Sequence, residues 1–418
     1  MNSLVRLHKR LLSGVPLSGL LHSLFAGLKV LSVLYELVAR ARVAFYRWGI
    51  RTRYRSSLPV ISVGNLAAGG TGKTPVCDLL LKLARERGLR AALVSRGYGG
   101  NYRSDYRVVS NGRQILAEAA ECGDEPLMLA QRNPEAVVVV ARRRADGLRY
   151  LEQNVSVDLV VLDDGYQHLQ VERDLNLLLL DATRPFGNGY VLPAGNLREP
   201  RAAVARADLI LMTRYNGRAL PPATFSAPVL NCRYRLSRQV RDLAGETLPL
   251  AGLRGRPLVL FAGVADPDAF AASVRQFGLE VRHCRAFDDH AVYSASIQRE
   301  LEHLAGADGV LLTTEKDAVK LKAANFSVPC YVAGLDLHVD NTAVLEELFD
   351  TAINRRGRRM NLRKELLDIL ACPKCKGEVK LVEKGEESSI DCALCQLSYP
   401  VRDGIPVMLI DEARPLGK

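Results

Sequence analysis

Short apolar runs alternate with amphipathic stretches along most of the chain. Residues 91–95 and 137–141 are typical of the runs, because each holds five apolar or small residues in succession, as a strand buried on both faces requires. Residues 76–84 instead place apolar side chains at helical intervals. This alternation predicts an α/β fold with mostly parallel sheets covered by helices on both faces. Further strands of this kind are expected at residues 58–63, 157–162, 175–180, 209–212, 257–262 and 309–312.

The first part of the chain has a different pattern. Residues 11–39 are apolar but interrupted by His22, Lys29 and Glu36, which are seven residues apart. On a helix these three side chains would form one stripe and leave a broad apolar face, which predicts an amphipathic helix in a membrane interface. A transmembrane span over residues 11–28 is weakened by its proline and glycines, and a buried core helix is the third alternative.

Charge is concentrated at the same end of the chain. The 418 residues carry a net charge of +11, of which residues 1–55 hold +9. An excess confined to one end indicates a local anionic partner, which is either a membrane surface or nucleic acid. Single-stranded nucleic acid favours basic residues interleaved with stacking aromatics along a groove. Here the charge lies on an apolar helix, so an anionic membrane surface is expected and no nucleic acid.

A glycine-rich sequence follows the first predicted strand and precedes the first predicted helix of the α/β part, which is the context of a phosphate-binding loop. Its glycines allow backbone N–H groups to approach phosphate oxygens, and the helix directs its positive dipole end there. The lysine is expected to contact the β- and γ-phosphates of the nucleotide. The hydroxyl of the last threonine is expected to bind Mg²⁺. An alanine stands at the first position, where the strict motif has glycine. The loop residues are Ala67, Ala68, Gly69, Gly70, Thr71, Gly72, Lys73 and Thr74.

Asp163 and Asp164 directly follow the apolar run at residues 157–162. An apolar strand that ends in aspartate is how phosphate-loop enzymes hold Mg²⁺ and its water shell. Many strands end in aspartate, but together with the upstream loop this pair predicts a magnesium site.

Several other polar residues have two interpretations each. Arg96 lies in a loop and either meets a phosphate or is solvated, and Arg198 lies in a loop between two prolines. Asp124 and Glu125 either serve a site or merely favour a helix N-terminus. His290 follows two aspartates, and a neighbouring carboxylate can orient an imidazole for proton transfer, although a lone histidine is more often structural.

The last part of the chain carries a pattern typical of zinc. Two Cys-X-X-Cys pairs are separated by sixteen residues, and two such pairs can place four thiolates around one ion. Because the protein would supply all four ligands, the site is expected to be structural and to stabilise a domain with little core of its own. The predicted Zn²⁺ ligands are Cys372, Cys375, Cys392 and Cys395.

The motifs of residues 58–350 resemble the tetraacyldisaccharide 4'-kinase family (LpxK) of lipid A biosynthesis, whose own phosphate loop departs from the strict pattern at position 67. The resemblance implies a P-loop kinase with two α/β lobes that works on a membrane-embedded acylated disaccharide, at the cytoplasmic face of the inner membrane of a Gram-negative bacterium. It rests on Val-Gly-Asn-Leu-Ala-Ala-Gly-Gly-Thr-Gly-Lys-Thr-Pro at 63–75, Ser-Arg-Gly-Tyr-Gly at 95–99, Gly-Asp-Glu-Pro at 123–126, Asp-Asp-Gly-Tyr-Gln-His at 163–168, residues 193–200, Asp-His at 289–290 and Thr-Glu-Lys-Asp-Ala-Val at 314–319.

The resemblance also assigns roles to residues in these motifs. Asp124 matches the base toward the sugar hydroxyl, and His290 matches its partner. Lys73, Asp163 and Asp164 complete the expected catalytic set, while Thr74, Asp163, Glu125 and Gln167 are the expected Mg²⁺ ligands. Arg96 and Arg198 are expected to join the loop in binding ATP. The reaction implied is transfer of the γ-phosphate to the 4'-hydroxyl of tetraacyldisaccharide 1-phosphate, which gives lipid IVA.

The C-terminal part resembles a second family, the small zinc-ribbon (Trm112-like) proteins that activate methyltransferases, so a methyltransferase is a possible partner. The leading alternative for the whole chain is a nucleic-acid-associated P-loop NTPase with a zinc-ribbon binding module. The expected parts are a membrane-associating helical segment (1–55), a nucleotide-binding lobe (56–200), a second α/β lobe (201–353), a basic linker (354–363) and the zinc ribbon (364–418).

Overall fold

A mixed sheet of thirteen strands runs through the larger of the two units into which the chain divides. The units are Met1–Glu346 and Glu347–Lys418. The computed structural model describes residues 19–217, 225–264, 267–288, 291–360, 370–384, 387–402 and 405–416, and all statements below concern these residues.

The first lobe contains seven strands of the sheet in the order β7-β6-β1-β5-β2-β4-β3, which pair in parallel except for β3, antiparallel at the edge. Every residue of β1, β2, β4, β5 and β7 is buried, which explains their continuous apolar sequences. The strands are β1 (Val60–Asn65), β2 (Ala91–Ser95), β3 (Tyr106–Asn111), β4 (Val137–Ala141), β5 (Leu159–Asp163), β6 (Leu175–Asp181) and β7 (Leu209–Thr213).

Helices cover this sheet and bring two loops to one edge. Helix α3 (Lys73–Glu86) packs on β1, β2 and β5, and α6 (Arg144–Asn154) packs on β2 and β4. Helix α5 (Asp124–Arg132) contacts β3, β4 and α3 and follows the short α4 (Ala119–Cys122). Because parallel strands end at the same edge, the loops after β1 and β5 lie close together there.

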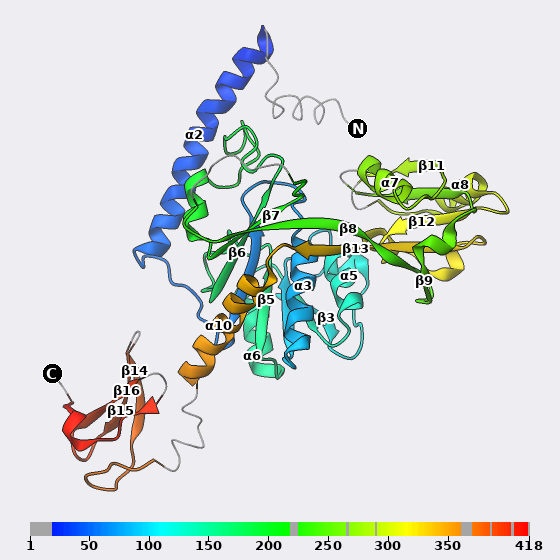
Figure 1. Cartoon of the computed structure of the whole chain (residues 1–418). Helices are drawn as coiled ribbons and strands as arrows, with labels where there is room; N and C mark the ends of the chain where they lie inside the picture. The colour runs from blue at the N-terminus through cyan, green and yellow to red at the C-terminus, as the bar shows by residue number, and fades with distance from the viewer. Residues whose placement is uncertain are drawn as a thin grey trace. The chain divides into compact units, whose positions relative to one another are not determined.

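Two long antiparallel strands lead into the second lobe. Strand β8 (Val229–Asp242) begins alongside β7 and continues alongside β13 (Cys330–Val339), as Figure 1 shows. The second lobe adds β9 (Thr247–Pro249), β10 (Leu258–Ala262), β11 (Val281–Ala286), β12 (Val310–Thr314), α7 (Pro267–Arg275), α8 (Ala295–Ala305), α9 (Glu315–Ala318) and the short helices η2 (Leu250–Leu253) and η3 (Ala323–Asn325). The short helix η1 (Arg201–Arg206) precedes β7 and packs in the core of the first lobe. The predicted α/β class with mostly parallel strands in two lobes is confirmed.

Helix α2 (Leu20–Arg47) lies against the loop that leads to Arg198. The Ser32 hydroxyl donates to Val191 O at 2.8 Å and accepts from Ala194 N at 2.9 Å, and Lys29 lies 5.1 Å from the ring centroid of Tyr190. The rest of α2 carries a set of exposed apolar side chains. Its members are Leu24, Val30, Leu31, Val33, Leu34, Leu37, Val38 and Phe45.

The described part of α2 extends to Arg47, beyond the predicted end at residue 39. Residues 11–18 of the alternative span at residues 11–28 lie outside the described residues. Among the helices that are described, none combines the length and the apolar character needed to cross a bilayer.

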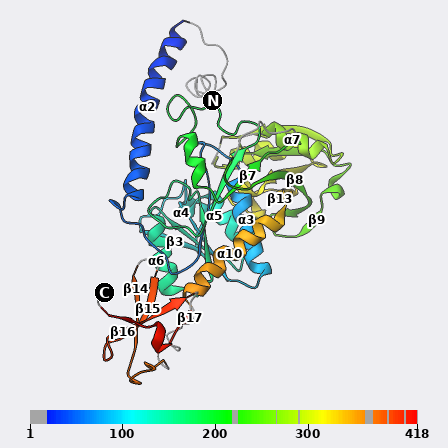
Figure 2. The same cartoon turned by 60° about the vertical axis from the view of Figure 1, so that its left-hand side comes forward.

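The smaller unit has its own antiparallel sheet, formed by β14 (Lys380–Lys384), β15 (Glu387–Cys392), β16 (Leu397–Arg402), β17 (Ile405–Pro406) and β18 (Arg414–Pro415), with η4 (Ile410–Glu412) beside it (Figure 2). Ile390 and Tyr399 are fully buried in its small core together with Cys372 and Cys392. Helix α10 (Thr342–Met360) spans the boundary between the units, so the first residues of the predicted linker 354–363 are helical.

Ser32 provides a test of how α2 is held. Ser32→Ala leaves the buried Ala194 N–H without its acceptor, and an unsatisfied buried group costs about 1–3 kcal/mol. We expect faster hydrogen exchange in α2 and in residues 190–198. Ser23→Ala, an exposed serine on the same helix, is the matched control and should exchange like the wild type. Equal exchange in all three proteins would show that this contact does not hold α2.

Candidate active site

The phosphate loop lies between β1 and α3, as its sequence predicts. Gly72 precedes the first turn of α3 with φ 82°, and a Cβ there would lie 1.6 Å from the Tyr234 hydroxyl. Gly69 also has a positive φ, of 117°. Both positions therefore require glycine, the first because of conformation and contact together.

The start of the loop is paired to the segment that precedes Arg198. Ala67 forms an antiparallel bridge with Leu197, and Ala68 N donates to Asn196 O at 2.6 Å. The side chain of Asn65 also donates to Ala67 O at 2.8 Å. The departure at Ala67 from the strict motif therefore lies where the loop adopts an extended, paired conformation that any residue can take.

Lys73 and Arg198 both bind Asp164. Lys73 Nζ lies 3.3 Å from Asp164 Oδ1, and Arg198 Nη1 donates to the two carboxylate oxygens at 3.0 and 2.8 Å. Burial opposes ionisation of Asp164, but these two cations hold its pKa below the ordinary value. Asp164 is thus an anion that holds the side chains of Lys73 and Arg198 next to the phosphate loop.

Asp163 lies deeper than Asp164. Its Oδ2 accepts from Ser95 Oγ at 2.9 Å, and burial raises its pKa, against the opposing effect of Lys73. The fully buried Arg144 donates to Asp163 O and to Ala141 O, each at 2.8 Å, and burial lowers the pKa of Arg144 to about 10. These bonds fix the end of β5 and leave a carboxylate that a divalent cation would stabilise.

Gln167 and Thr74 add oxygen atoms of the kind that bind Mg²⁺. Gln167 Nε2 donates to Asn65 O at 2.8 Å, whereas the buried Gln167 Oε1 has no hydrogen-bond partner among the described residues. Thr74 lies in the first turn of α3 beside Lys73. Carboxylate, hydroxyl and amide oxygens are the donors that Mg²⁺ accepts, so the predicted set fits a magnesium ion.

A cavity of about 990 Å³ is lined by Lys73, by the two aspartates and by Arg198. Its walls come from α2, from the phosphate loop, from the loops after β2 and β5 and from the second lobe. The predicted site residues in its lining are Gly69, Gly70, Lys73, Arg96, Glu125, Asp163, Asp164, Gln167 and Arg198, and α2 contributes Tyr35, Val38, Ala39, Arg42 and Val43.

One expected catalytic residue, Asp124, is not among the lining residues. Asp124, 6% exposed, is the first residue of α5 and directly precedes Glu125, and its Oδ2 lies 3.3 Å from Lys320 Nζ. His290 lies outside the described residues, so its pairing with Asp124 stays a prediction.

Several residues of the site had no role assigned from the sequence. Ser95 and Arg144 support Asp163, and His168 lines the cavity as a neutral imidazole, because burial and the nearby Arg144 lower its pKa to about 3. Lys316 reaches the cavity from the second lobe, with Nζ 3.6 Å from Glu125 Oε1. The arginine run after the strand at residues 137–141 was the available signal for Arg144.

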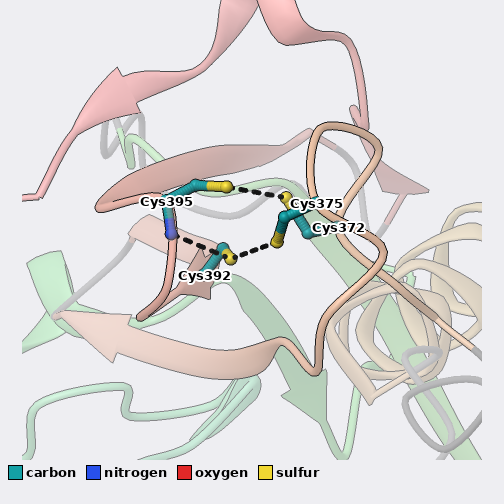
Figure 3. Close-up of side chains that lie close together, drawn as sticks. All are labelled: Cys372, Cys375, Cys392 and Cys395. Carbon is teal, nitrogen blue, oxygen red and sulfur yellow. Dashed lines mark hydrogen bonds between the residues drawn. The ribbon is translucent and has the colours of Figure 1, made fainter.

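The four predicted zinc ligands come together in the smaller unit (Figure 3). Their sulfur atoms all lie within 4.8 Å of one another, with 3.9 Å between Cys372 and Cys395 and 3.5 Å between Cys375 and Cys392. Tetrahedral Zn–S bonds of about 2.3 Å place neighbouring sulfurs about 3.8 Å apart, so the cluster fits zinc. Burial opposes ionisation of Cys372, but hydrogen bonds, first from the Tyr399 hydroxyl, lower its pKa to about 6.

Comparison with known proteins agrees with this geometry. The model of the LpxK family, tetraacyldisaccharide-1-P 4'-kinase, matches residues 24–354, and that of the Trm112p-like proteins matches residues 363–404. Tetraacyldisaccharide 4'-kinases of Syntrophotalea carbinolica and Geobacter sulfurreducens are each 42% identical to the chain. They align with 85% and 82% of this chain and with 100% and 98% of their own lengths.

A solved structure shows the same fold. The crystal structure of LpxK from Aquifex aeolicus in complex with ATP is 28% identical, with a TM-score of 0.70, and the match covers 79% of this chain and 99% of that one. With a family match over both lobes and α2, the chain belongs to the tetraacyldisaccharide 4'-kinase family and carries a Trm112p-like segment at its C-terminal end.

Proposed function

We propose that this protein transfers the γ-phosphate of Mg·ATP to the 4'-hydroxyl of a tetraacylated glucosamine disaccharide 1-phosphate and so forms lipid IVA. One observation carries the proposal: a single cavity is lined by the phosphate loop with Lys73 and by the apolar side chains of Val38 and Val43 on α2. A polar end for phosphate transfer and an apolar wall beside it suit a substrate with a sugar headgroup and acyl chains.

The charges in the cavity suit phosphoryl transfer, which has a loose transition state and depends on positioning and electrostatics. Lys73 and Arg198 supply positive charge next to the loop, and bound phosphate oxygens would compete with Asp164 for them. Mg²⁺, held by Thr74 and Asp163 with Glu125 and Gln167 as further ligands, would neutralise charge on the β- and γ-phosphates. Arg96, at the end of β2, would contact ATP phosphate or the anionic lipid headgroup.

Asp124 is proposed as the base that orients the sugar hydroxyl and accepts its proton, with His290 as its partner. The support is the match to the family motif and the place of Asp124 at the start of α5, beside a residue that lines the cavity. Because phosphoryl transfer needs little nucleophile activation, the role of this base is chiefly orientation.

Helix α2 is proposed to lie on the anionic cytoplasmic surface of the inner membrane. Its outer face is apolar and exposed, and the segment around it is basic. Each Lys or Arg close to an anionic leaflet contributes about 1 kcal/mol to binding. The tetraacylated substrate stays in the bilayer, so an enzyme held at its surface meets that substrate directly.

The smaller unit is proposed to hold one structural Zn²⁺ and to offer a surface to a methyltransferase. The four clustered sulfurs support the metal, and the exposed Leu394, Leu409 and Ile410 support an apolar contact surface. A nucleic-acid-associated NTPase, the alternative class, is not favoured, because the kinase family match covers α2 and both lobes.

The role of Asp124 can be tested by kinetics. Asp124→Asn removes the proton acceptor, so kcat for lipid phosphorylation should fall about 10²- to 10⁴-fold while the affinity for ATP is unchanged. Asp105→Asn, an exposed aspartate in the loop before β3, is the control and should behave like the wild type. A kcat near the wild-type value in Asp124→Asn would exclude Asp124 as the base.

Membrane binding can be tested by sedimentation with vesicles. Leu34→Glu with Leu37→Glu places two charges on the exposed apolar face of α2 and should abolish co-sedimentation with anionic phospholipid vesicles. Ile115→Glu, which changes an exposed isoleucine elsewhere, should leave co-sedimentation intact. Undiminished binding of the double variant would contradict an interfacial role for this face.

Zinc content provides a test of the smaller unit. We expect one zinc per chain, and we expect Cys392→Ser to lose it together with the slow hydrogen exchange of β15 and β16. Cys284→Ser, at an exposed cysteine on β11, should retain the metal. A folded, protected sheet in metal-free protein would show that the ion is not structural.

A further inference from the structure

The segment of residues 314–320 in the second lobe docks onto α5, the helix that begins with Asp124. It belongs to one of the motifs noted in the sequence, yet none of the roles proposed above involves it as a whole. Three ion pairs connect the segment to α5: Glu315 Oε2 to Arg132 Nη1 at 3.4 Å, Lys316 Nζ to Glu125 Oε1 at 3.6 Å, and Lys320 Nζ to Asp124 Oδ2 at 3.3 Å. The pairs occur along the length of α5, from its first residue to its last.

Asp317 holds the segment in shape. It is completely buried, and a buried carboxylate is tolerated only when hydrogen bonds satisfy it. Its donors are the Tyr293 hydroxyl and the Thr314 hydroxyl, each at 2.7 Å, and Gly263 N at 3.0 Å. All three belong to the second lobe, so Asp317 is a fixed anchor within that lobe.

Lys320 connects this anchor to Asp124. Its Nζ lies 3.4 Å from Asp317 Oδ1 and 3.3 Å from Asp124 Oδ2, and 5.3 Å from the ring centroid of Tyr293. The side chain of Lys320 is 13% exposed and that of Asp124 is 8% exposed. At such low exposure, salt screens the attraction much less than on the surface.

We propose that Lys320 is a positioning residue for the base: its ammonium group, fixed by Asp317, binds Asp124 Oδ2 and stabilises the carboxylate in the orientation needed for the sugar hydroxyl. The inference rests on the proposed role of Asp124. It adds that the second lobe completes the site, because the cation that orients the base comes from that lobe.

The other groups around Asp124 do not replace this cation. Tyr293 and Cys122 are neutral, because burial raises the pKa of each, to about 12 for Cys122. Glu125 and Asp317 are carboxylates that disfavour a second negative charge nearby. Lys316 pairs with Glu125 rather than with Asp124, and His290 is the expected partner from outside the described residues.

Kinetics of variants at position 320 test the proposal. Lys320→Met keeps the length of the side chain and removes its charge. We expect kcat to fall about ten- to a hundredfold, with KM for ATP unchanged, because the base loses its orientation.

The controls separate positioning from folding. Lys320→Arg retains the charge and should recover most of kcat, while Lys322→Met, at an exposed lysine two residues along, should leave kcat unchanged. In Asp124→Asn, adding Lys320→Met should cause no further loss of kcat, because the two residues act through one contact.

Three results would overturn the proposal. One is wild-type kcat in Lys320→Met. Another is a loss of kcat that follows the fraction of unfolded protein and that Lys320→Arg does not recover. The third is an undiminished effect of Lys320→Met in the Asp124→Asn background. Absence of lipid phosphorylation by the wild type itself would contradict the proposed function and this inference with it.

Discussion

The site depends on two adjacent carboxylates at the end of β5, Asp163 and Asp164. Asp163 is buried and Asp164 is partly buried, so each needs a positively charged partner or a hydrogen-bond donor. Asp164 binds Lys73 and Arg198, while Asp163 is buried and suited to a metal ion. Arg198 follows Leu197, which pairs with Ala67 of the phosphate loop. The segment that leads to Arg198 is also held to α2, through Ser32, so the phosphate site and the proposed membrane helix form one connected structure.

Much of the fold could be predicted because buried parallel strands have continuous apolar sequences. Residues 91–95 and 137–141 are strands with those bounds. Strand β8 was not predicted, because its sequence, Val-Leu-Asn-Cys-Arg-Tyr-Arg-Leu-Ser-Arg-Gln-Val-Arg-Asp, is largely polar and its burial is irregular. Strand β8 pairs first with β7 and then with β13, so no single core covers its whole length. Its sequence therefore lacks a regular apolar pattern from which a strand could be predicted.

The site shows the same division between local and distant information. The motifs assigned Lys73 and Asp164 to one phosphate and magnesium site, and the two residues form an ion pair. The spacing of the four cysteines likewise predicted the cluster that they form. The support of Asp163 by Arg144 was not predictable, because one arginine in a run of three is distinguished only by its burial. The contact of Lys320 with Asp124 joins residues almost two hundred positions apart, which no local pattern reveals.

A transfer assay tests the proposed reaction most directly. It contains the purified chain, ATP labelled in the γ-phosphate, Mg²⁺ and tetraacyldisaccharide 1-phosphate in detergent micelles. We expect a labelled lipid, with the new phosphate on the 4'-position, and no change in activity when nucleic acid is added. Hydrolysis of ATP without a labelled lipid, or activity that depends on nucleic acid, would contradict the proposed function.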